Sequence, residues 1–228
     1  MIINGLQKLT LLDFPGKTAC TVFFAGCDFR CPFCHNATLV RNEGYDIPEE
    51  EFFSFLETRK GRLDGVAITG GEPLMQADVG DFMKKIKDRG CLVKLDTNGS
   101  YPKRLKELVG NGLCDYVAMD VKSSPEGYER AAGVKVPLEK ISESIELLMT
   151  CGIEYEFRTT VAKGAVLPED FEGIGKWITG AKRYFLQGFV DSGDILGEGI
   201  GAYSPDEMKG FLETVKKYVP AAELRGVN

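Results

Sequence analysis

Short apolar or β-branched runs alternate along the chain with longer segments in which apolar residues recur at helical spacing. The short runs are typical of buried strands and the longer segments of amphipathic helices. The pattern predicts six strands, at residues 18–25, 65–69, 91–96, 115–121, 153–161 and 182–189. It predicts six helices, at residues 48–60, 76–89, 102–111, 137–151, 168–179 and 204–218. Several of these helices begin with Pro or Ser followed by acidic residues, as helix starts do.

The alternation of strands and helices is typical of βα units around a parallel sheet. Six units are too few for a closed eight-stranded barrel, and their order fits a partial barrel and an open doubly wound sheet equally well. Both folds place ligands at the carboxyl ends of the strands. Residues 28–46 and 191–203 have the composition of loops. Because no linker or repeat is evident, we expect residues 1–228 to form a single domain.

Charge and cysteine content narrow the function classes. The chain has 28 Lys and Arg against 34 Asp and Glu, a net charge of −6, and no basic run that would bind nucleic acid. No apolar stretch reaches the roughly 18 residues of a membrane span, and the N-terminus lacks a secretory signal pattern. We therefore expect a cytoplasmic protein without a nucleic-acid or membrane partner. The cysteines number seven, so they cannot all pair within the chain.

Three cysteines stand together in the loop after the first predicted strand. These are Cys27, Cys31 and Cys34, whose spacing CxxxCxxC allows all three to coordinate one metal centre. A structural zinc site usually has four ligands, and the only histidine, His35, adjoins Cys34, where its ring is poorly placed to bind the same ion. A 4Fe-4S cluster held by three cysteines keeps one iron open to a small molecule. The spacing alone leaves a cluster, a zinc site and buried thiols open.

The second predicted strand ends in Thr69-Gly70-Gly71-Glu72-Pro73. Adjacent glycines can expose backbone carbonyls to a ligand, and Pro73 favours the start of the next helix. By itself this segment also fits a plain turn between a strand and a helix.

Charged residues stand where the next predicted strands stop. Asp96 ends the third strand, Asp120 and Lys122 lie at the end of the fourth, and Arg158 lies in the fifth. Two carboxylates at one mouth would suit a cation or a ribose, whereas Lys122 and Arg158 could pair with a carboxylate.

The cysteine triplet with Phe33 before its last cysteine resembles the signature of the radical S-adenosylmethionine (radical SAM) superfamily. The resemblance implies a partial (β/α)6 barrel and one 4Fe-4S cluster on Cys27, Cys31 and Cys34, through which SAM is cleaved reductively. The glycine-rich segment resembles the part of that family that receives the methionine ammonium of SAM, which implies that Gly70, Gly71 and Glu72 bind the cofactor together with Phe33.

Further segments resemble the activating enzymes of glycyl radical enzymes, and especially the anaerobic ribonucleoside-triphosphate reductase activating proteins. They are Asp13-Phe14-Pro15-Gly16-Lys17, Cys34-His35-Asn36, Asp96-Thr97-Asn98-Gly99 and Asp120-Val121-Lys122. The resemblance implies hydrogen abstraction from a glycine of a partner glycyl radical enzyme, of the ribonucleotide reductase or pyruvate formate-lyase type. It also implies a low-potential reductant such as flavodoxin or ferredoxin.

The same resemblance assigns individual residues. The implied SAM contacts from the later strands are Asp96, Thr97, Lys122, Arg158, Thr160 and Gln187. In the pyruvate formate-lyase activator a monovalent cation lies beside the SAM carboxylate, and its ligands match Asp96, Thr97, Ala118 and Asp120. Gln187 stands where that activator has a histidine. Residues 36–48 hold no further cysteines, so a single cluster is expected.

Two alternatives remain open. A radical SAM enzyme that acts on a small molecule, such as a 7-carboxy-7-deazaguanine synthase, would share the cysteine triplet and the glycine-rich segment. A zinc-binding or electron-transfer module would need only the cysteines, and it would leave Gly70-Gly71-Glu72-Pro73, Asp96 and Arg158 without a role.

Overall fold

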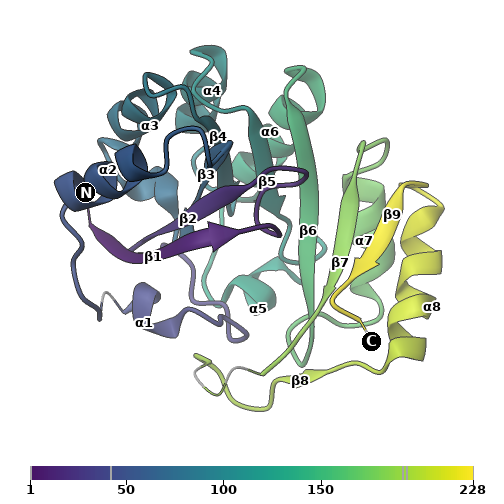
Figure 1. The fold of residues 1–228 in the computed structure, drawn as a ribbon. Coiled ribbons are helices and arrows are strands. Elements are labelled where there is room, and N and C mark those ends of the chain that lie inside the picture. The colour runs from purple at the N-terminus through teal and green to yellow at the C-terminus, as the bar shows by residue number, and fades with distance from the viewer. Residues whose placement is uncertain (1, 42, 192, 194, 228) are drawn as a thin grey trace. The chain divides into compact units, whose positions relative to one another are not determined.

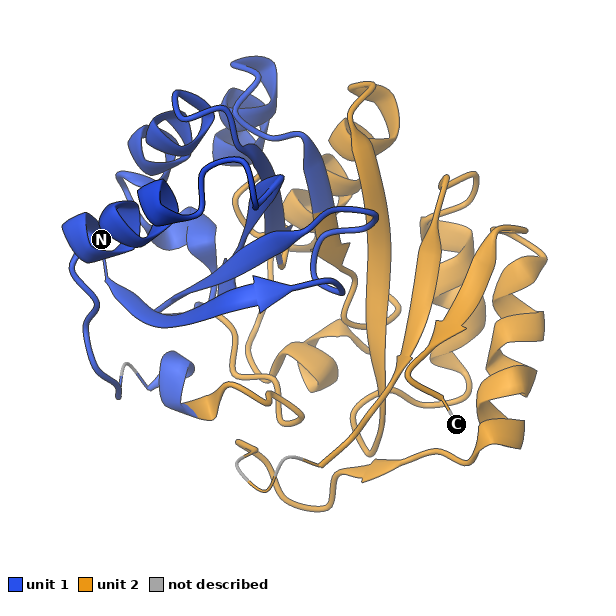
Figure 2. Ribbon diagram, in the orientation of Figure 1, with its two compact units in different colours: residues 1–28, 38–97, 103–117 blue, residues 29–37, 98–102, 118–228 orange. Residues whose placement is uncertain are grey.

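All six predicted strands and all six predicted helices form, with ends shifted by a few residues. The structure is a computed structural model that describes residues 2–41, 43–191, 193 and 195–227. Strands and helices alternate along the chain in an α/β arrangement (Figure 1). Figure 2 colours two compact units. Unit 1 is Met1–Asp28, Thr38–Thr97 and Lys103–Val117, and unit 2 is Phe29–Ala37, Asn98–Pro102 and Ala118–Asn228.

Unit 1 contains the first four strands, β1 (Ile3–Thr10), β2 (Ala19–Phe24), β3 (Gly65–Gly70) and β4 (Leu92–Thr97). β1 and β2 form an antiparallel hairpin, and β2, β3 and β4 are parallel neighbours (Figure 1). The register of β2 and β3 pairs Ala19 with Gly65 and Phe24 with Gly70. The parallel strands therefore reach their carboxyl ends at one edge of the sheet of this unit.

The helices of unit 1 are short. They are α1 (Ala37–Val40), α2 (Glu49–Thr58), the 3-10 helix η1 (Pro73–Met75), α3 (Val79–Lys87) and α4 (Pro102–Gly110). Both α2 and α3 bury their apolar faces. The rings of Phe52, Phe53 and Phe82 lie 5.1–5.2 Å apart, and Phe24 of β2 lies 5.4 Å from Phe82. This aromatic cluster packs the helices against the sheet.

Unit 2 contains β6 (Glu154–Lys163), β7 (Tyr184–Gly188), β8 (Gly201–Ala202) and β9 (Ala222–Arg225). β6, β7 and β9 are parallel neighbours, and β8 pairs antiparallel with β6. Its helices are α5 (Tyr128–Ala132), α6 (Leu138–Thr150), α7 (Asp170–Trp177) and α8 (Pro205–Lys216). α8 lies beside α7 and β9 (Figure 1). It begins with a capping box between Ser204 and Glu207, which satisfies the first free N–H groups of the helix.

One strand belongs to both units. β5 (Tyr116–Asp120) begins in unit 1 and ends in unit 2. In unit 1 the Asp115 N–H donates to the Val93 carbonyl beside β4, and in unit 2 the Val121 N–H donates to the Arg158 carbonyl of β6.

The strands β1, β8 and β9 and the helices α1 and α5 were not among the predicted elements. β1 contains an Asn-Gly pair and no long apolar run, β8 has two residues, and β9 contains Ala and Glu, which are weak strand formers. Each of these strands forms because a neighbouring strand offers it backbone hydrogen bonds.

Candidate functional site

In unit 1 the end of β3 holds the chain just before Cys27. The Gly71 N–H donates to the Phe24 carbonyl, and the Glu72 N–H donates to the Gly26 carbonyl, both at 2.8 Å. The first turn of the predicted cluster loop is thus fixed by the glycine-rich segment.

The two glycines of this segment are required by that close approach. Gly70 has φ +125°, and a Cβ on it would lie 2.3 Å from the backbone of Phe24. A Cβ on Gly71 would lie 1.8 Å from the Gly26 carbonyl oxygen. No side chain fits at either position, so a bare backbone is needed here for the fold itself as well as for any ligand.

Glu72 is fully buried and bonds within unit 1. Its Oε1 accepts the Leu74 N–H at 3.0 Å and so caps η1, and it accepts the Thr97 hydroxyl at 2.8 Å. The structure therefore brings together Glu72 and Thr97, two predicted cofactor residues that follow β3 and end β4.

At the end of β4 the carboxylate of Asp96 is paired with a lysine. The Lys94 side chain is 2% exposed, and its ammonium forms an ion pair with Asp96 Oδ1. Lys94 and Asp96 share one face of the strand because they are two positions apart, whereas Thr97 belongs to the opposite face.

Unit 2 contains the other two predicted cluster ligands. The Cys34 N–H donates to the Cys31 carbonyl at 3.0 Å, so the two cysteines share one turn. Cys31 and Phe33 are buried and Cys34 is half-buried. The start of this loop is anchored to α5, where the Arg30 N–H donates to the Ala132 carbonyl at 2.8 Å.

The glycine-rich loop after β7 also contacts the cysteine loop. The Gly197 N–H donates to the Pro32 carbonyl at 2.9 Å, and a Cβ on Gly197 would lie 2.4 Å from Pro32 Cβ. The His35 ring stacks on Phe189 with centroids 5.4 Å apart. Residues 192 and 194 of the predicted 191–203 loop lie outside the described residues.

A charged group of three side chains lies on β5 and β6 in unit 2, with Asp120 at the end of β5, Lys122 just after it and Arg158 within β6. Asp120 Oδ1 accepts from Arg158 Nε at 2.8 Å, and Oδ2 accepts from Lys122 Nζ at 3.0 Å. Burial acts to raise the pKa of Asp120, but Arg158 and Lys122 outweigh it and hold that pKa well below its usual range. Burial likewise acts to lower the pKa of Lys122, and Asp120 reverses this and raises it. All three groups are therefore charged at neutral pH.

This charged group extends electrostatically to the cysteine loop. Burial raises the pKa of the Cys31 thiol to about 11, the Lys122 ammonium acts to lower it, and the Cys34 thiol adds to the rise. A nearby ammonium stabilises a thiolate, which is the form that binds metal.

The remaining predicted residues of unit 2 lie on the sheet. Thr160 of β6 and Gln187 of β7 are directly paired by the parallel register, and both are half-buried. Ala118 lies buried within β5.

The predicted site residues fall in both units. Unit 1 holds Cys27, Gly70, Gly71, Glu72, Asp96 and Thr97, and unit 2 holds Cys31, Phe33, Cys34, Ala118, Asp120, Lys122, Arg158, Thr160 and Gln187. Within the described part of the chain, no group of three His, Cys, Asp or Glu side chains is placed to hold a metal ion.

The donor chemistry fits an iron–sulfur cluster and fits a monovalent cation poorly. None of the seven cysteines, all of them described, forms a disulfide, and thiolates are the ligands that such clusters prefer. Asp96 is instead paired with Lys94, and Asp120 with Lys122 and Arg158, so each carboxylate already has a positive partner.

Four residues that support the cysteine loop were missed by the sequence analysis. Gln76 Nε2 donates to the Ala25 carbonyl at 2.9 Å. Gly133 ends α5 with φ +69°, and a Cβ there would lie 2.0 Å from the Arg30 carbonyl oxygen. The others are Gly197 and Phe189. A glycine after a helical segment is a recognisable helix end, but no local pattern indicates which loop these residues contact.

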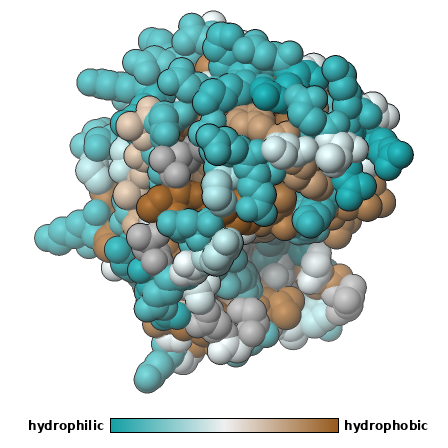
Figure 3. Space-filling view, turned by 60° about the vertical axis from the view of Figure 1, so that its left-hand side comes forward, coloured by the Kyte–Doolittle hydropathy of each residue, from teal (hydrophilic) through white to brown (hydrophobic). Residues whose placement is uncertain are grey.

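The surface has two further features away from the predicted site residues, a set of exposed hydrophobic side chains and a pocket. Large hydrophobic side chains are exposed at Leu9, Leu11, Leu12, Tyr45, Met75 and Val190. Figure 3 shows hydrophobic surface among hydrophilic side chains on one face. Among the described residues, none of the helices combines the length and the apolar composition that a membrane span requires.

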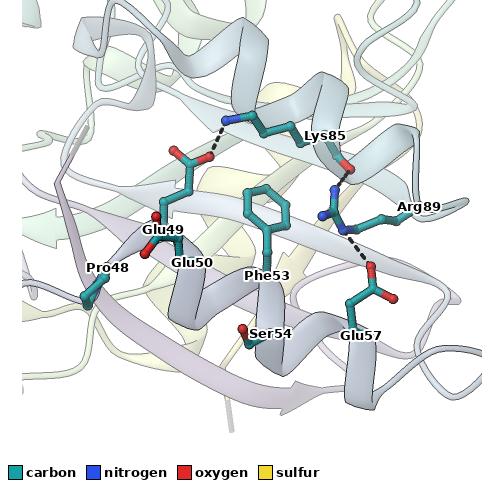
Figure 4. Close-up of a pocket in the computed structure, with 8 residues that line it drawn as sticks. All are labelled: Pro48, Glu49, Glu50, Phe53, Ser54, Glu57, Lys85 and Arg89. Carbon is teal, nitrogen blue, oxygen red and sulfur yellow. Dashed lines mark hydrogen bonds and ion pairs between the residues drawn. The ribbon is translucent and has the colours of Figure 1, made fainter.

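A surface pocket of about 760 Å³ lies between α2 and α3 (Figure 4). Four of its charged side chains form two ion pairs: Lys85 Nζ lies 2.6 Å from Glu49, and Arg89 Nε lies 2.9 Å from Glu57. Phe53 lies between these pairs, with the Arg89 guanidinium over its ring. None of the predicted site residues lines this pocket.

Comparison with known proteins identifies relatives over the whole chain. The family model of the Radical SAM superfamily matches residues 21–178. A Methanocaldococcus jannaschii protein, named provisionally as a glycyl-radical enzyme activating enzyme, is 31% identical over 100% of this chain and 97% of its own length. The pyruvate formate-lyase-activating enzyme of Clostridium pasteurianum is 32% identical over 58% of this chain and 57% of its own.

Solved structures share the fold. Streptococcus suis SuiB, bound to its precursor peptide SuiA, superposes with a TM-score of 0.73 at 15% sequence identity. The match covers 90% of this chain and 48% of SuiB. Together with the family match over residues 21–178, this likeness confirms the predicted fold class, an α/β fold of the radical SAM partial-barrel type.

Proposed function

The chain belongs to the radical SAM superfamily, and from this we propose that it is an activase that generates a radical on a glycine of a partner enzyme. The proposed partner is a glycyl radical enzyme of the anaerobic ribonucleotide reductase or pyruvate formate-lyase type. The observation that carries the proposal is the relative named as such an activating enzyme, which this chain matches from end to end.

The proposed cofactors are one 4Fe-4S cluster on Cys27, Cys31 and Cys34 and one SAM. When bound, and with an electron from a low-potential reductant such as flavodoxin or ferredoxin, these cofactors would supply a deoxyadenosyl radical able to take a hydrogen atom from the glycine Cα, with methionine and deoxyadenosine as the products. The unpaired electron would remain on the glycine Cα of the partner.

The residues of the chain position these groups. Lys122 places a positive charge near the Cys31 thiol, which favours the thiolate. Lys122 and Arg158 suit the SAM carboxylate, because their pairs with Asp120 fix both side chains on neighbouring strands of unit 2. Thr160 and Gln187, paired across β6 and β7, are the proposed contacts from the neighbouring strands. The carbonyls of Gly70 and Gly71 are the proposed acceptors for the SAM ammonium.

Two assays test the chemistry and the substrate separately. The chain is reconstituted anaerobically with iron and sulfide, reduced in the presence of SAM, and assayed for deoxyadenosine and methionine. It is then incubated with a candidate glycyl radical enzyme, and EPR is used to detect a glycyl doublet. We expect both signals.

Matched cysteine variants assign the ligands. Cys31→Ala should abolish cluster absorbance, deoxyadenosine and the EPR doublet. Cys151→Ala removes a half-buried thiol outside the loop and should leave all three unchanged. Zinc binding without SAM cleavage would contradict the radical SAM proposal.

The second candidate is a radical SAM enzyme that acts on a small molecule, such as a 7-carboxy-7-deazaguanine synthase. Deoxyadenosine formation without a glycyl doublet on every partner tested would favour this candidate. The end-to-end match to a chain named as an activating enzyme is the observation that ranks it second.

A further inference from the structure

Lys94 is a fully buried lysine that the proposed chemistry does not use. Its side chain is 2% exposed, and it stands on β4 opposite Ala67 of β3. Lysine is almost never buried to this extent without a partner of opposite charge. That partner is Asp96, which is itself 16% exposed and two residues further along the same face of the strand.

Asp96 is also the carboxylate that the sequence resemblance assigns to a monovalent cation. A metal ion at its Oδ1 would have to displace the Lys94 ammonium or lie directly against it. Displacement would leave the ammonium buried without its counter-charge, and contact would place two positive charges side by side in a poorly solvated position. Both arrangements are unfavourable.

The other residues that the resemblance assigns to the monovalent cation are also poorly suited to bind it. Thr97 lies on the opposite face of β4 from Asp96, and its hydroxyl donates to the buried Glu72 at 2.8 Å. In unit 2, Asp120 has Lys122 and Arg158 as positive partners. Asp96 and Asp120 therefore both have positively charged partners already, and neither needs a metal ion to balance its charge.

We infer that Lys94 is the built-in cation of this site: its ammonium takes the place beside Asp96 that the sequence resemblance assigns to a monovalent metal ion. Lys94 is a positioning residue, because it acts through Asp96. The inference rests on the proposed function only because that function places SAM near Asp96. It predicts that this protein binds no sodium or potassium ion at Asp96.

The test measures cation binding directly and needs no SAM turnover. Melting temperatures of the apoprotein are compared in potassium chloride and in N-methylglucamine chloride of equal concentration, and bound thallium(I) is followed by NMR. The wild type should melt at the same temperature in both salts and should bind no thallium(I). Lys94→Met leaves Asp96 without its ammonium and should gain a cation site, with a melting temperature higher in potassium by about 2–4 °C.

Two further variants keep the result interpretable. Lys94→Arg retains the positive charge and should behave as the wild type even if Lys94→Met fails to fold. Lys84→Met removes an exposed lysine of unit 1 and should gain no potassium dependence. Thallium(I) binding by the wild type that Asp96→Asn abolishes would overturn the inference. The deoxyadenosine and EPR assays are independent of this test. Thallium(I) binding by the wild type would therefore not contradict the proposed function, and negative deoxyadenosine and EPR assays would not contradict the inference about Lys94.

Discussion

Cys20 shows how burial alone sets the chemistry of one side chain. It lies on β2 with no exposed surface. Burial raises the pKa of its thiol from 9.0 to about 12, and the nearby Cys91 adds to the rise. At a pH between these two pKa values, the Cys20 thiol keeps its proton in the folded state but loses it in the unfolded chain. The stabilisation is fully present below the unfolded pKa and is lost as the pH rises towards 12.

We therefore predict that Cys20 makes the folded state sensitive to alkali. Above about pH 9 the free energy of unfolding should fall by roughly 1 kcal/mol per pH unit through this group. Cys20→Ala should lower stability by about 1–2 kcal/mol at neutral pH and flatten the alkaline slope. Urea titrations from neutral pH to pH 10 measure both effects. Cys151→Ala should keep the wild-type slope, and equal slopes for wild type and Cys20→Ala would contradict the argument.

Arg158 is predicted to act through charge on both stability and cofactor binding. Arg158→Met removes one of the two cations that hold Asp120, at a position where both side chains are mostly buried. We expect a loss of about 1–3 kcal/mol in the free energy of unfolding, together with weaker SAM binding in equilibrium dialysis. Arg183→Met breaks an exposed pair with Glu154 and should cost less than about 1 kcal/mol. Unchanged SAM affinity in Arg158→Met would remove Arg158 from the proposed site.

Among the elements, the loop after β7 supports the cysteine loop through a glycine. A methyl group on Gly197 would collide with Pro32, which lies between Cys31 and Phe33. Gly197→Ala should therefore displace the cysteine loop and lower the iron content after reconstitution several-fold, while the chain stays folded. Gly201→Ala adds a methyl group that meets no atom within 4 Å and should retain full iron content. Equal iron in the two variants, measured beside circular dichroism, would show that the contact does not support the loop.

The sequence predicts the elements that depend on local pattern and misses those that depend on partners. Runs such as residues 65–69 and 115–121 are apolar because both faces of a parallel strand are buried. β9 has no such run and is a strand only because β7 pairs with it. In the candidate functional site too, features of local pattern are predicted and features that depend on tertiary contacts are missed. The spacing of Cys27, Cys31 and Cys34 is visible in the sequence, but the support from Gly197 and the pairing of Asp96 with Lys94 depend on which side chains the fold brings together.

At the scale of the whole molecule, the two units are interleaved in sequence. Each consists of three segments, and β5 begins in one and ends in the other. Neither unit can be cut from the chain as a continuous stretch. Because a strand shared by both units cannot unfold in one and remain intact in the other, we predict that residues 1–228 unfold as a single domain.

Two probes in different units test this prediction. The single tryptophan, Trp177, reports on unit 2, where its ring packs against Tyr128 at 5.6 Å and its N–H donates to Ser142. The Cys20 thiol reports on unit 1, because it is fully buried and reacts with an alkylating reagent only after the unit opens. Trp177 fluorescence and mass-spectrometric labelling of Cys20 should give the same urea midpoint and the same m-value. Separate midpoints would mean that the units unfold independently, which would contradict a single cooperative domain.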